Sequence, residues 1–424
     1  MKKLVILVLV ATLALGLVTQ ASSAVTIKFW THQNTAWNES YKGLIAEYEA
    51  AHPDVNIEYT TFPYSDFEAK IQTSLMAGSG GADLYEVSGS WITDFAASGK
   101  LSEVPADFLK ELRDDTYAPV MGASQIDGRF YGVPVEFNAE YGGMLVNKKL
   151  FEKSGLEYPK TWTEVLDIAR KVAVQNGEVM EMRGLEYAGS DSLTTNWLSM
   201  ILQKGGNYRA EDGTLDLANP IAVACMEELV SYQTVDHVTN NDSLTNAQGI
   251  ADHAFIAIDE CYMCISGTWT IADLEESYGV KFGTDFEYIS QPPFVEDVDP
   301  KWVATTGWTL SVPSASPVRD QAWEFVQYLL EPENLMRHNI ESAQIPPRKS
   351  VAMSPEYLAK VPYMNAIVNI LPYAQHMGAF NAATFKRYTS QMFLSLCAND
   401  GTYTSVEDAC QRLTTDLNSV LTFY

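Results

Sequence analysis

The stretch GRFYGVPVEFNAEYGGMLVNKKLF, residues 128–151, decides the fold that we expect for this chain. Its first part, Arg129–Val135, alternates aromatic, small and β-branched residues, which predicts an extended segment. Proline donates no backbone hydrogen bond, so Pro134 indicates an edge strand or a crossover. A second apolar run, Met144–Val146, comes just before the start of a predicted helix. Two extended segments therefore flank a short connection at residues 136–141, which contains polar, aromatic and acidic residues.

The sequence on both sides of this connection resembles that of a known family. YGVP at residues 131–134, followed about ten residues later by VNKKLF at residues 146–151, is similar to the interlobe crossover of bacterial extracellular solute-binding proteins of the sugar-transporter type, among them the maltodextrin-binding proteins. In that family a carboxylate just before the second strand of the crossover contacts the sugar, so the resemblance implies this role for Glu140. The alternative is a solvated strand–turn–strand with two ordinary surface glutamates.

The first residues predict export. Lys2 and Lys3 precede an uncharged apolar stretch, Leu4–Val18, and small residues follow at Ser22–Ala24. A basic, then an apolar, then a small-residue segment is typical of a secretory signal peptide, and this one is too short for a membrane span. We therefore predict a signal peptide at residues 1–24, cleaved near Ala24, and a mature protein in a bacterial periplasm.

Length and charge narrow the class of protein. The 424 residues leave about 400 after cleavage, which is enough for two domains with real cores. The formal net charge of −26 argues against nucleic acid and anionic membranes as partners, because both attract basic surfaces. The chain also lacks a nucleophile elbow, a phosphate loop and a dinucleotide fingerprint, so we expect neither a catalytic constellation nor a cofactor.

The five cysteines suggest at most two disulfides and one leftover thiol in an oxidising compartment. Cys397 and Cys410 flank a short loop, and we predict that these two form a disulfide. Cys225, Cys261 and Cys264 are interpreted as buried structural thiols, because a zinc site at the last two would need a second pair of ligands at suitable spacing. The histidines show no pair at helical ligand spacing, so no metal site is predicted.

The amino-terminal residues predict a parallel α/β unit. Val25–Trp30 has the pattern of a strand, Trp37–Ala51 that of an amphipathic helix, and Val55–Thr60 that of a second strand. Ligands of such sheets lie beyond the carboxyl ends of the strands. The candidate binding residues at these ends are Trp30, His32, Gln33 and Tyr64.

The resemblance adds candidates in both halves of the chain. The family's loop after the third strand, predicted here at Asp83–Val87, presents polar and aromatic residues to the sugar, which implies these roles for Ser90 and Trp91. The family also places a Gly-x-Trp at a strand end in the carboxy-terminal lobe, where the indole stacks on the sugar. Trp269 matches this motif, although its lead-in departs from the family's usual residues. A core tryptophan at a strand end is the alternative.

Further candidates lie at predicted helix starts, strand ends and crossovers in the second half of the chain. They are Asn196, Trp197, Gly307, Trp308 and Arg348. The glycine allows a close backbone approach to a ligand. The arginine lies in a segment that resembles the place where the family's chain leaves the first lobe again. Indole rings cover the apolar face of a sugar while carboxylates and amides bind its hydroxyls, which is why we expect tryptophans and glutamates in one site.

We expect an α/β protein with the two-lobed periplasmic-binding-protein fold and a ligand cleft that closes by a hinge between the lobes. The first lobe is predicted to comprise residues 25–134 and 306–347. The second is predicted to comprise residues 135–305 and a helical part at residues 348–424.

The resemblance implies a monomeric substrate-binding component of an ABC importer, which captures a mono- or oligosaccharide and delivers it to membrane permease subunits. A polyol or another small polar solute is the alternative ligand. A secreted glycoside hydrolase would also be rich in tryptophan and carboxylates, and Glu136 with Glu140 would be its candidate pair. The sequence lacks the eight-fold strand–helix recurrence of a barrel, so we expect a binding protein and not an enzyme.

Overall fold

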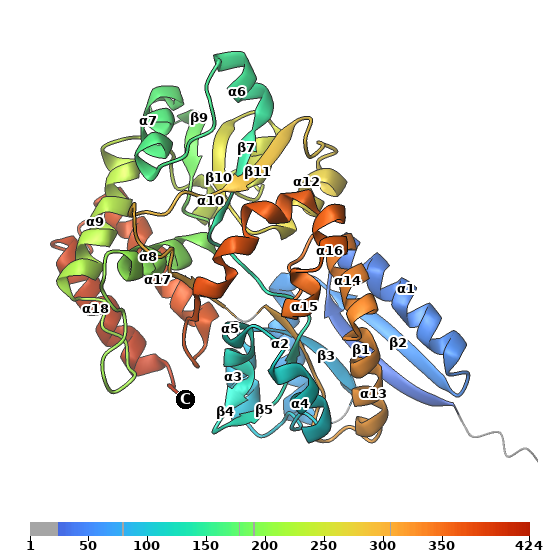
Figure 1. Ribbon diagram of the computed structural model, residues 1–424. Coiled ribbons are helices and arrows are strands. Elements are labelled where there is room, and N and C mark those ends of the chain that lie inside the picture. The colour runs from blue at the N-terminus through green and yellow to red at the C-terminus, as the bar shows by residue number, and fades with distance from the viewer. Residues whose placement is uncertain (1–23, 79, 178, 190, 306) are drawn as a thin grey trace, which may run out of the picture.

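The computed structural model describes residues 24–424 except residues 79, 178, 190 and 306. The predicted signal peptide, apart from its last residue, lies outside the described residues. Two five-stranded sheets lie in separate halves of the molecule, each covered by helices (Figure 1). Within the described part of the chain, no helix combines the length and apolar character needed to cross a membrane.

The sheet of the first lobe has the strand order β2-β1-β3-β13-β6. Its strands are β1 (Val25–His32), β2 (Val55–Phe62), β3 (Leu84–Ser88), β6 (Val133–Pro134) and β13 (Trp308–Ser311). β1 pairs in parallel with β2 and β3, whereas β13 runs antiparallel between β3 and β6. Ile27 and Phe29 point into the core from β1, as the period of two requires.

Helices cover this sheet. α1 (Thr35–Ala51) begins where the Asn34 side chain accepts a hydrogen bond from the backbone of Trp37, and its apolar face buries Tyr41 and Leu44. The other helices of this half are α2 (Tyr64–Ala77), α3 (Ile92–Ala97), α4 (Ala106–Arg113), α5 (Ala118–Met121), α13 (Arg319–Leu329) and α14 (Pro332–Glu341). α14 packs beside α1 (Figure 1).

The sheet of the second lobe has the order β11-β7-β10-β9-β8. Its strands are β7 (Gly143–Asn147), β8 (Val174–Asn176), β9 (Val179–Glu186), β10 (Cys261–Ile265) and β11 (Phe286–Ser290). The helices of this half before residue 300 are α6 (Lys148–Ser154), α7 (Trp162–Val172), α8 (Ser192–Gln203), α9 (Pro220–Thr234), α10 (Asp242–Thr245), α11 (Ala254–Ala257) and α12 (Trp269–Ser277). Every residue of β7 is buried, so this strand lies at the centre of the lobe.

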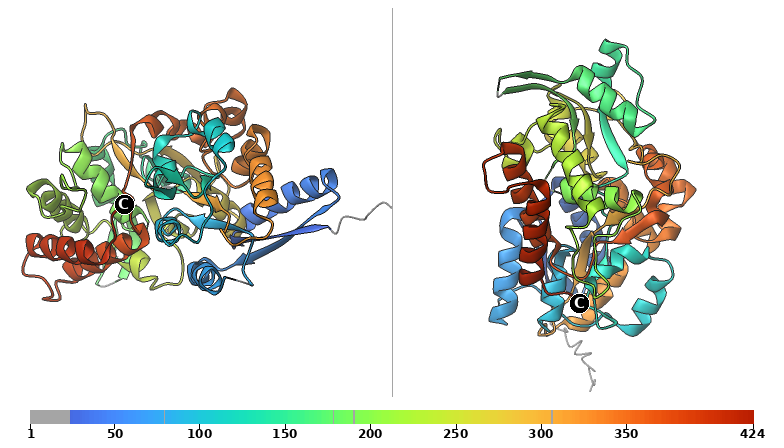
Figure 2. Two further views of the ribbon diagram at one scale, coloured as in Figure 1. Left: turned by 90° about the horizontal axis from the view of Figure 1, so that it is seen from below. Right: turned by 90° about the vertical axis from the view of Figure 1, so that its left-hand side faces the viewer.

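The carboxy-terminal residues return to the second lobe. α17 (Ala382–Ala398) and α18 (Val406–Val420) pack against α8 and α9, at the end of the molecule opposite α1 (Figure 2). Before them, α15 (Lys349–Ala352) and α16 (Pro355–Lys360) share an apolar cluster with both crossovers. Within this helical part lie two 3-10 segments, Pro362–Ala366 and Val368–Tyr373.

The chain passes between the two sheets after β6 and again between β12 (Trp302–Ala304) and β13. β12 pairs in parallel with β14 (Ala374–His376), so the carboxy-terminal part braces the second passage. The strand predicted at residues 129–135 is split: β5 (Arg129–Phe130) pairs with β4 (Gln125–Ile126), and β6 pairs with β13. Gly132 lies between the two strands. A side chain does not fit there, because a Cβ would lie 2.5 Å from the hydroxyl of Ser311.

The predicted disulfide is absent, since Cys397 and Cys410 are both free thiols in the structure. Cys397 lies beside Asn241 at the end of α17, whereas Cys410 is buried in the core close to Glu227 of α9. A disulfide requires that the two Cβ atoms face each other. Proximity along the sequence does not fix that direction on two separate helices, which is why the prediction was wrong.

Non-reducing peptide mapping is expected to recover both cysteines as thiols that alkylate only after unfolding. Burial raises the pKa of each thiol to about 12, so almost no reactive thiolate exists in the native protein near neutral pH. Alkylation with and without urea, followed by mass spectrometry, measures this directly. A cross-linked peptide that contains both residues would contradict the structure.

Candidate functional site

A cavity of about 240 Å³ lies between the lobes. The first-lobe sheet and both crossovers contribute to its wall, and the second lobe contributes residues at the starts of α8, α12 and α17. It is lined by His32, Asn34, Trp37, Tyr64, Ser88, Ser90, Glu136, Asn138, Glu140, Asp191, Trp269, Thr305, Gly307, Trp308, Gln344 and Lys386. The carboxyl ends of β1 and β3 reach it, as expected for a parallel α/β sheet.

Aromatic rings form the first-lobe side of the cavity. The rings of His32 and Trp308 stack with their centroids 4.0 Å apart and their planes 5° from parallel. Trp37 packs edge-on against His32, with a centroid distance of 5.1 Å. Tyr64 lies edge-on to Trp308 with a centroid distance of 6.0 Å. Trp91 also lies edge-on to Trp308, with a centroid distance of 5.7 Å. These mutual contacts fix the orientation of the rings before any ligand arrives.

A buried carboxylate holds the imidazole of His32. Nδ1 of His32 lies 2.6 Å from Oε2 of Glu86, which comes from β3 and is fully buried. The hydroxyl of Tyr41 donates to the other oxygen of Glu86 at 3.0 Å. A carboxylate at this distance requires the proton on Nδ1, so the ring is fixed in one tautomer.

Glu136 joins the first crossover to β13. Its Oε1 accepts a hydrogen bond of 2.9 Å from the backbone N–H of Trp308, and the residue is only 3% exposed. A Cβ at Gly307 would lie 2.6 Å from this carboxyl group, so the position requires glycine. Burial raises the pKa of Glu136 to about 8, and the nearby Glu86 and Glu140 act in the same direction.

Glu140 connects the crossover to the second lobe. Nε1 of Trp269 donates a hydrogen bond of 2.9 Å to its Oε1, and Glu140 is also only 3% exposed. Burial raises the pKa of Glu140 to about 7, helped by the charge of Asp191 and opposed by Lys386 and the indole N–H. Glu140 is therefore enclosed, which does not fit the alternative of an ordinary surface glutamate.

Lys386 brings a cation from α17 into the same wall. Its Nζ lies 2.8 Å from Oδ1 of Asp191, which immediately precedes α8. The ammonium group is almost completely buried, whereas the aspartate is about half exposed. The ion pair thus connects the carboxy-terminal helices to the cavity.

Trp269 rests on a buried histidine. The ring of His253 meets the indole edge-on with a centroid distance of 5.1 Å. Its Nε2 lies 2.7 Å from Asp273, and its Nδ1 lies 3.2 Å from Asp252. These two carboxylates outweigh burial and raise the pKa of His253 to about 9, so the ring is an imidazolium at neutral pH.

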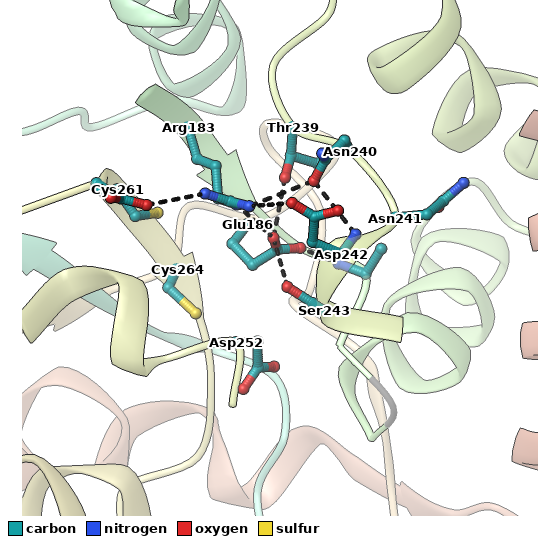
Figure 3. A network of polar contacts seen from close by, with 12 residues as sticks. Arg183, Glu186, Thr239, Asn240, Asn241, Asp242, Ser243, Asp252, Cys261 and Cys264 are labelled. Carbon is teal, nitrogen blue, oxygen red and sulfur yellow. Dashed lines mark hydrogen bonds and ion pairs between the residues drawn. The ribbon is translucent and has the colours of Figure 1, made fainter. Parts of the chain in front are cut away.

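A second polar network lies farther from the cavity, beside β9 (Figure 3). The fully buried Arg183 donates from Nη2 to Asp242 at 2.9 Å, and its guanidinium covers the ring of Phe255 at 3.5 Å. Burial and the charge of Asp252 raise the pKa of Glu186 to about 7, although the carboxyl group accepts hydrogen bonds from Thr239 and Ser243. The network fastens the segment after α9 to β9, the strand that leads toward Asp191.

The structure brings part of the predicted site together. The predicted residues that line the cavity are His32, Tyr64, Ser90, Glu140, Trp269, Gly307 and Trp308. Trp269 begins α12 instead of ending a strand, but its side chain still reaches the wall.

Three predicted first-lobe residues do not line the cavity. Trp30 packs against Phe62 and Tyr85 and borders a separate groove beside α2. Gln33 lies in a neighbouring pocket shared with α12. Trp91 is 3% exposed and packs behind the rings that form the wall.

Three further predictions are corrected by burial and ion pairing. Trp197 is fully buried in the second-lobe core, where its Nε1 donates to the backbone of Ala222. Asn196 is equally buried and donates to the backbone of Tyr187. Arg348 pairs with Asp115 at 2.8 Å on the first lobe, away from the cavity.

Sequence reasoning missed several residues of the wall. They are Asn34, Trp37, Ser88, Glu136, Asn138, Asp191, Thr305, Gln344 and Lys386. Glu136 and Asn138 belong to the crossover already singled out, so its alternating polar residues were an available signal. Asp191 and Lys386 are 195 residues apart, and nothing local indicates that they meet. Among the described residues, no cluster of three or more His, Cys, Asp or Glu side chains is placed to hold a metal ion.

The chain is similar to known sequences of binding proteins. A sequence profile for bacterial extracellular solute-binding proteins matches residues 33–336. The arabinooligosaccharide-binding protein of Bacillus subtilis is 27% identical over 246 residues, which cover 54% of each chain. An uncharacterized ABC transporter extracellular-binding protein of Pyrococcus horikoshii is 24% identical over 155 residues, or 36% of each chain. The chain thus spans about a third to a half of these curated relatives.

Solved structures share the fold. An ABC substrate-binding protein from Listeria monocytogenes in complex with cycloalternan superposes with a TM-score of 0.76 at 19% identity, covering 93% of this chain and 98% of that one. A maltose-bound protein from T. maritima gives a TM-score of 0.76 at 19% identity, covering 94% and 100%. These neighbours confirm the predicted two-lobed fold. With the profile matching well over half of its length, the chain belongs to the bacterial extracellular solute-binding proteins.

Proposed function

We propose that the protein is the substrate-binding component of an ABC importer and captures a carbohydrate in the interlobe cavity. The observation that carries this proposal is that one cavity is lined both by the stacked rings of His32 and Trp308 and by two enclosed carboxyl groups. These carboxyl groups belong to Glu136 and Glu140. Aromatic rings pack against the C–H face of a sugar, and carboxyl groups bind its hydroxyls. The names of the Bacillus subtilis relative and of the ligand-bound neighbours support a carbohydrate.

The cavity size favours a small ligand. Its volume of about 240 Å³ is below the roughly 300–1,000 Å³ that is usual for drug-sized ligands. A monosaccharide or a short oligosaccharide fits this better than a long chain. A polyol or another small polar solute is the second candidate, because the same wall offers many hydrogen-bonding groups.

Capture and release follow from the two-lobed wall. His32 and Trp308 come from the first lobe, whereas Trp269 and Lys386 come from the second. A ligand that contacts both sets favours the closed arrangement over an open one, because those contacts exist only when the lobes meet. We infer that the closed form of a monomer in the periplasm then docks on the permease subunits and delivers the sugar.

The cavity supports binding better than glycoside hydrolysis. Hydrolysis requires one carboxyl group that is protonated and another that is ionised. Burial raises the pKa of both Glu136 and Glu140, whereas a hydrolase pair needs one carboxyl group with a raised pKa and one that its surroundings keep ionised. Incubation with labelled oligosaccharides should therefore return them uncleaved.

A thermal-shift screen with mono- and oligosaccharides tests the proposal. A ligand that binds only the native state raises the unfolding midpoint, by an amount that grows with its concentration. Small-angle scattering with the strongest hit should then show a smaller radius of gyration. The proposal fails if polyols or amino acids shift the midpoint while every carbohydrate leaves it unchanged.

Replacing Glu140 by glutamine is expected to weaken binding of the strongest sugar hit by about ten- to a hundred-fold, since hydrogen bonds to charged groups contribute about 1.5–3 kcal/mol. Titration calorimetry measures the loss. Glu356→Gln is the matched control, because that side chain is 65% exposed on α16 and outside the cavity. Equal affinities for the two variants would mean that Glu140 does not contact the ligand.

A further inference from the structure

The charges of the cavity wall do not balance. The wall carries three carboxyl groups, Glu136, Glu140 and Asp191, and one ammonium group, Lys386. Lys386 is bonded to Asp191 at 2.8 Å. The imidazole of His32 is engaged by Glu86, behind the wall. Two carboxyl groups are therefore left without a cation of their own.

Both of these groups are enclosed, and the second carboxyl oxygen of each accepts no hydrogen bond from the described residues. In the described part of the chain each uses only Oε1, Glu136 with the backbone of Trp308 and Glu140 with the indole of Trp269. No lysine, arginine or histidine nitrogen among the described residues lies within 4.0 Å of either group. A buried carboxylate without a counter-ion is costly, so each would gain from a cationic partner.

A neighbouring side chain also lacks a donor. The Oδ1 atom of Asn138, between the two glutamates on the crossover, is buried and has no hydrogen-bond partner among the residues that the structure describes. Three successive polar residues of one face, at positions 136, 138 and 140, thus present oxygen acceptors to the cavity. Buried acceptors of this kind call for N–H or O–H donors from the ligand.

We propose that the ligand is a carbohydrate that carries a protonated amino group, and that its ammonium binds between Glu136 and Glu140. This inference rests on the proposed carbohydrate-binding function and narrows it to sugars that carry a positive charge. An ammonium supplies three N–H donors at once. The indoles of Trp269 and Trp308 in the same wall stabilise a cation through their ring faces.

The titration of the two glutamates supports the same conclusion. Burial raises the pKa of Glu136 to about 8 and that of Glu140 to about 7. A cation beside them lowers both pKa values again, because it favours the charged form. Binding of an amino sugar at near-neutral pH is therefore accompanied by proton release, whereas a neutral sugar lacks this electrostatic drive.

Calorimetric titration with matched sugars tests the proposal. The probes are glucosamine, galactosamine and mannosamine, each beside its neutral parent and its N-acetyl derivative, at a pH of about 6.5 where alkyl amines are protonated. The best amino sugar is expected to bind about ten- to a hundred-fold more tightly than its parent and its N-acetyl derivative. Titrations in two buffers of different ionisation heat should show proton release for the amino sugar.

Two variants locate the effect. Glu136→Gln and Glu140→Gln are each expected to reduce the preference for the amino sugar over its neutral parent by about tenfold, because each removes one negative charge from the site. Glu356→Gln, an exposed control on α16, should keep the full preference. Circular dichroism of each variant shows that a lost preference does not reflect a lost fold.

The outcomes separate this inference from the general function. A neutral parent or N-acetyl sugar that binds as tightly as the amino sugar overturns the cationic ligand and leaves carbohydrate binding intact. Spermidine, a cation that is not a sugar, is titrated as a third kind of probe. If spermidine binds and no sugar does, the carbohydrate function is overturned and the cationic site remains. If no probe binds, both are overturned.

Discussion

Glu136 is expected to lower the free energy of unfolding of the unliganded protein by roughly 3–5 kcal/mol as the pH rises from about 4.5 to about 8. Burial raises the pKa of Glu136 from 4.5 to about 8 in the folded protein. One pKa unit corresponds to about 1.36 kcal/mol. Between these two pH values the folded state keeps a proton that the unfolded state has lost, so this stability is fully present below pH 4.5 and is lost as the pH rises through 8.

Other groups titrate in the same pH range, and a variant isolates Glu136. Burial lowers the pKa of His338 to about 3 and that of His376 to about 4, so these two groups oppose the fall up to about pH 6.5. Glu140 and Glu186, both with a pKa raised to about 7, add to the fall at lower pH, and His253, with a pKa raised to about 9, adds to it above pH 6.5. Urea melts across this window should therefore show a clearly smaller fall for Glu136→Gln than for the native chain. Parallel pH profiles of the two proteins would show that Glu136 titrates normally.

Replacing Trp197 by alanine is expected to cost about 3–5 kcal/mol of folding stability, as large-to-small changes of core tryptophans do. This indole is fully buried and donates to the backbone of Ala222 at 2.9 Å. The Trp269→Ala variant should behave differently. Its side chain borders the cavity and hydrogen-bonds to Glu140, so affinity for the strongest sugar hit should fall by about ten- to a hundred-fold with a smaller loss of stability.

Urea melts and titration calorimetry on the two variants form a matched comparison. Trp197→Ala should retain its affinity at temperatures where it remains folded, because the residue does not touch the cavity. If Trp269→Ala loses as much stability as Trp197→Ala while its affinity is unchanged, then Trp269 is a core residue and the second-lobe wall has been assigned wrongly.

The sequence allowed the fold to be predicted because its signals are local. The alternation before Pro134, the apolar run of β7 and the strand–helix–strand order of the first residues each depend on neighbours along the chain. Glu140 was found in the same way, since its place before β7 fixes it at the junction of the lobes. Its enclosure was not predictable, because Trp269 and Lys386 reach it from distant segments.

The misplaced tryptophans show where local signals stop. Trp30 and His32 share one face of β1, yet only His32 reaches the cavity, because Trp30 lies one alternation back from the strand end and packs against Phe62 and Tyr85. The sequence makes Trp197 a candidate because it lies near the predicted start of a helix. Every position from Ser192 to Ile201 of α8 is buried, however, so this part of the helix has no face toward the cavity or the solvent. A pattern of polar and apolar residues does not distinguish a cavity from a core when both are lined by aromatic rings.

The insertion of β13 between β3 and β6 sets the order in which the two sheets of a growing chain become complete. All strands of the second-lobe sheet lie between residues 143 and 290, so that sheet can assemble as soon as this segment leaves the ribosome. The first-lobe sheet must wait for Trp308, which pairs with Ser88 from 220 residues earlier. At roughly 5–20 residues per second this is a delay of roughly 10–45 seconds. The sheet whose first strand is synthesised first is therefore the sheet that is finished last.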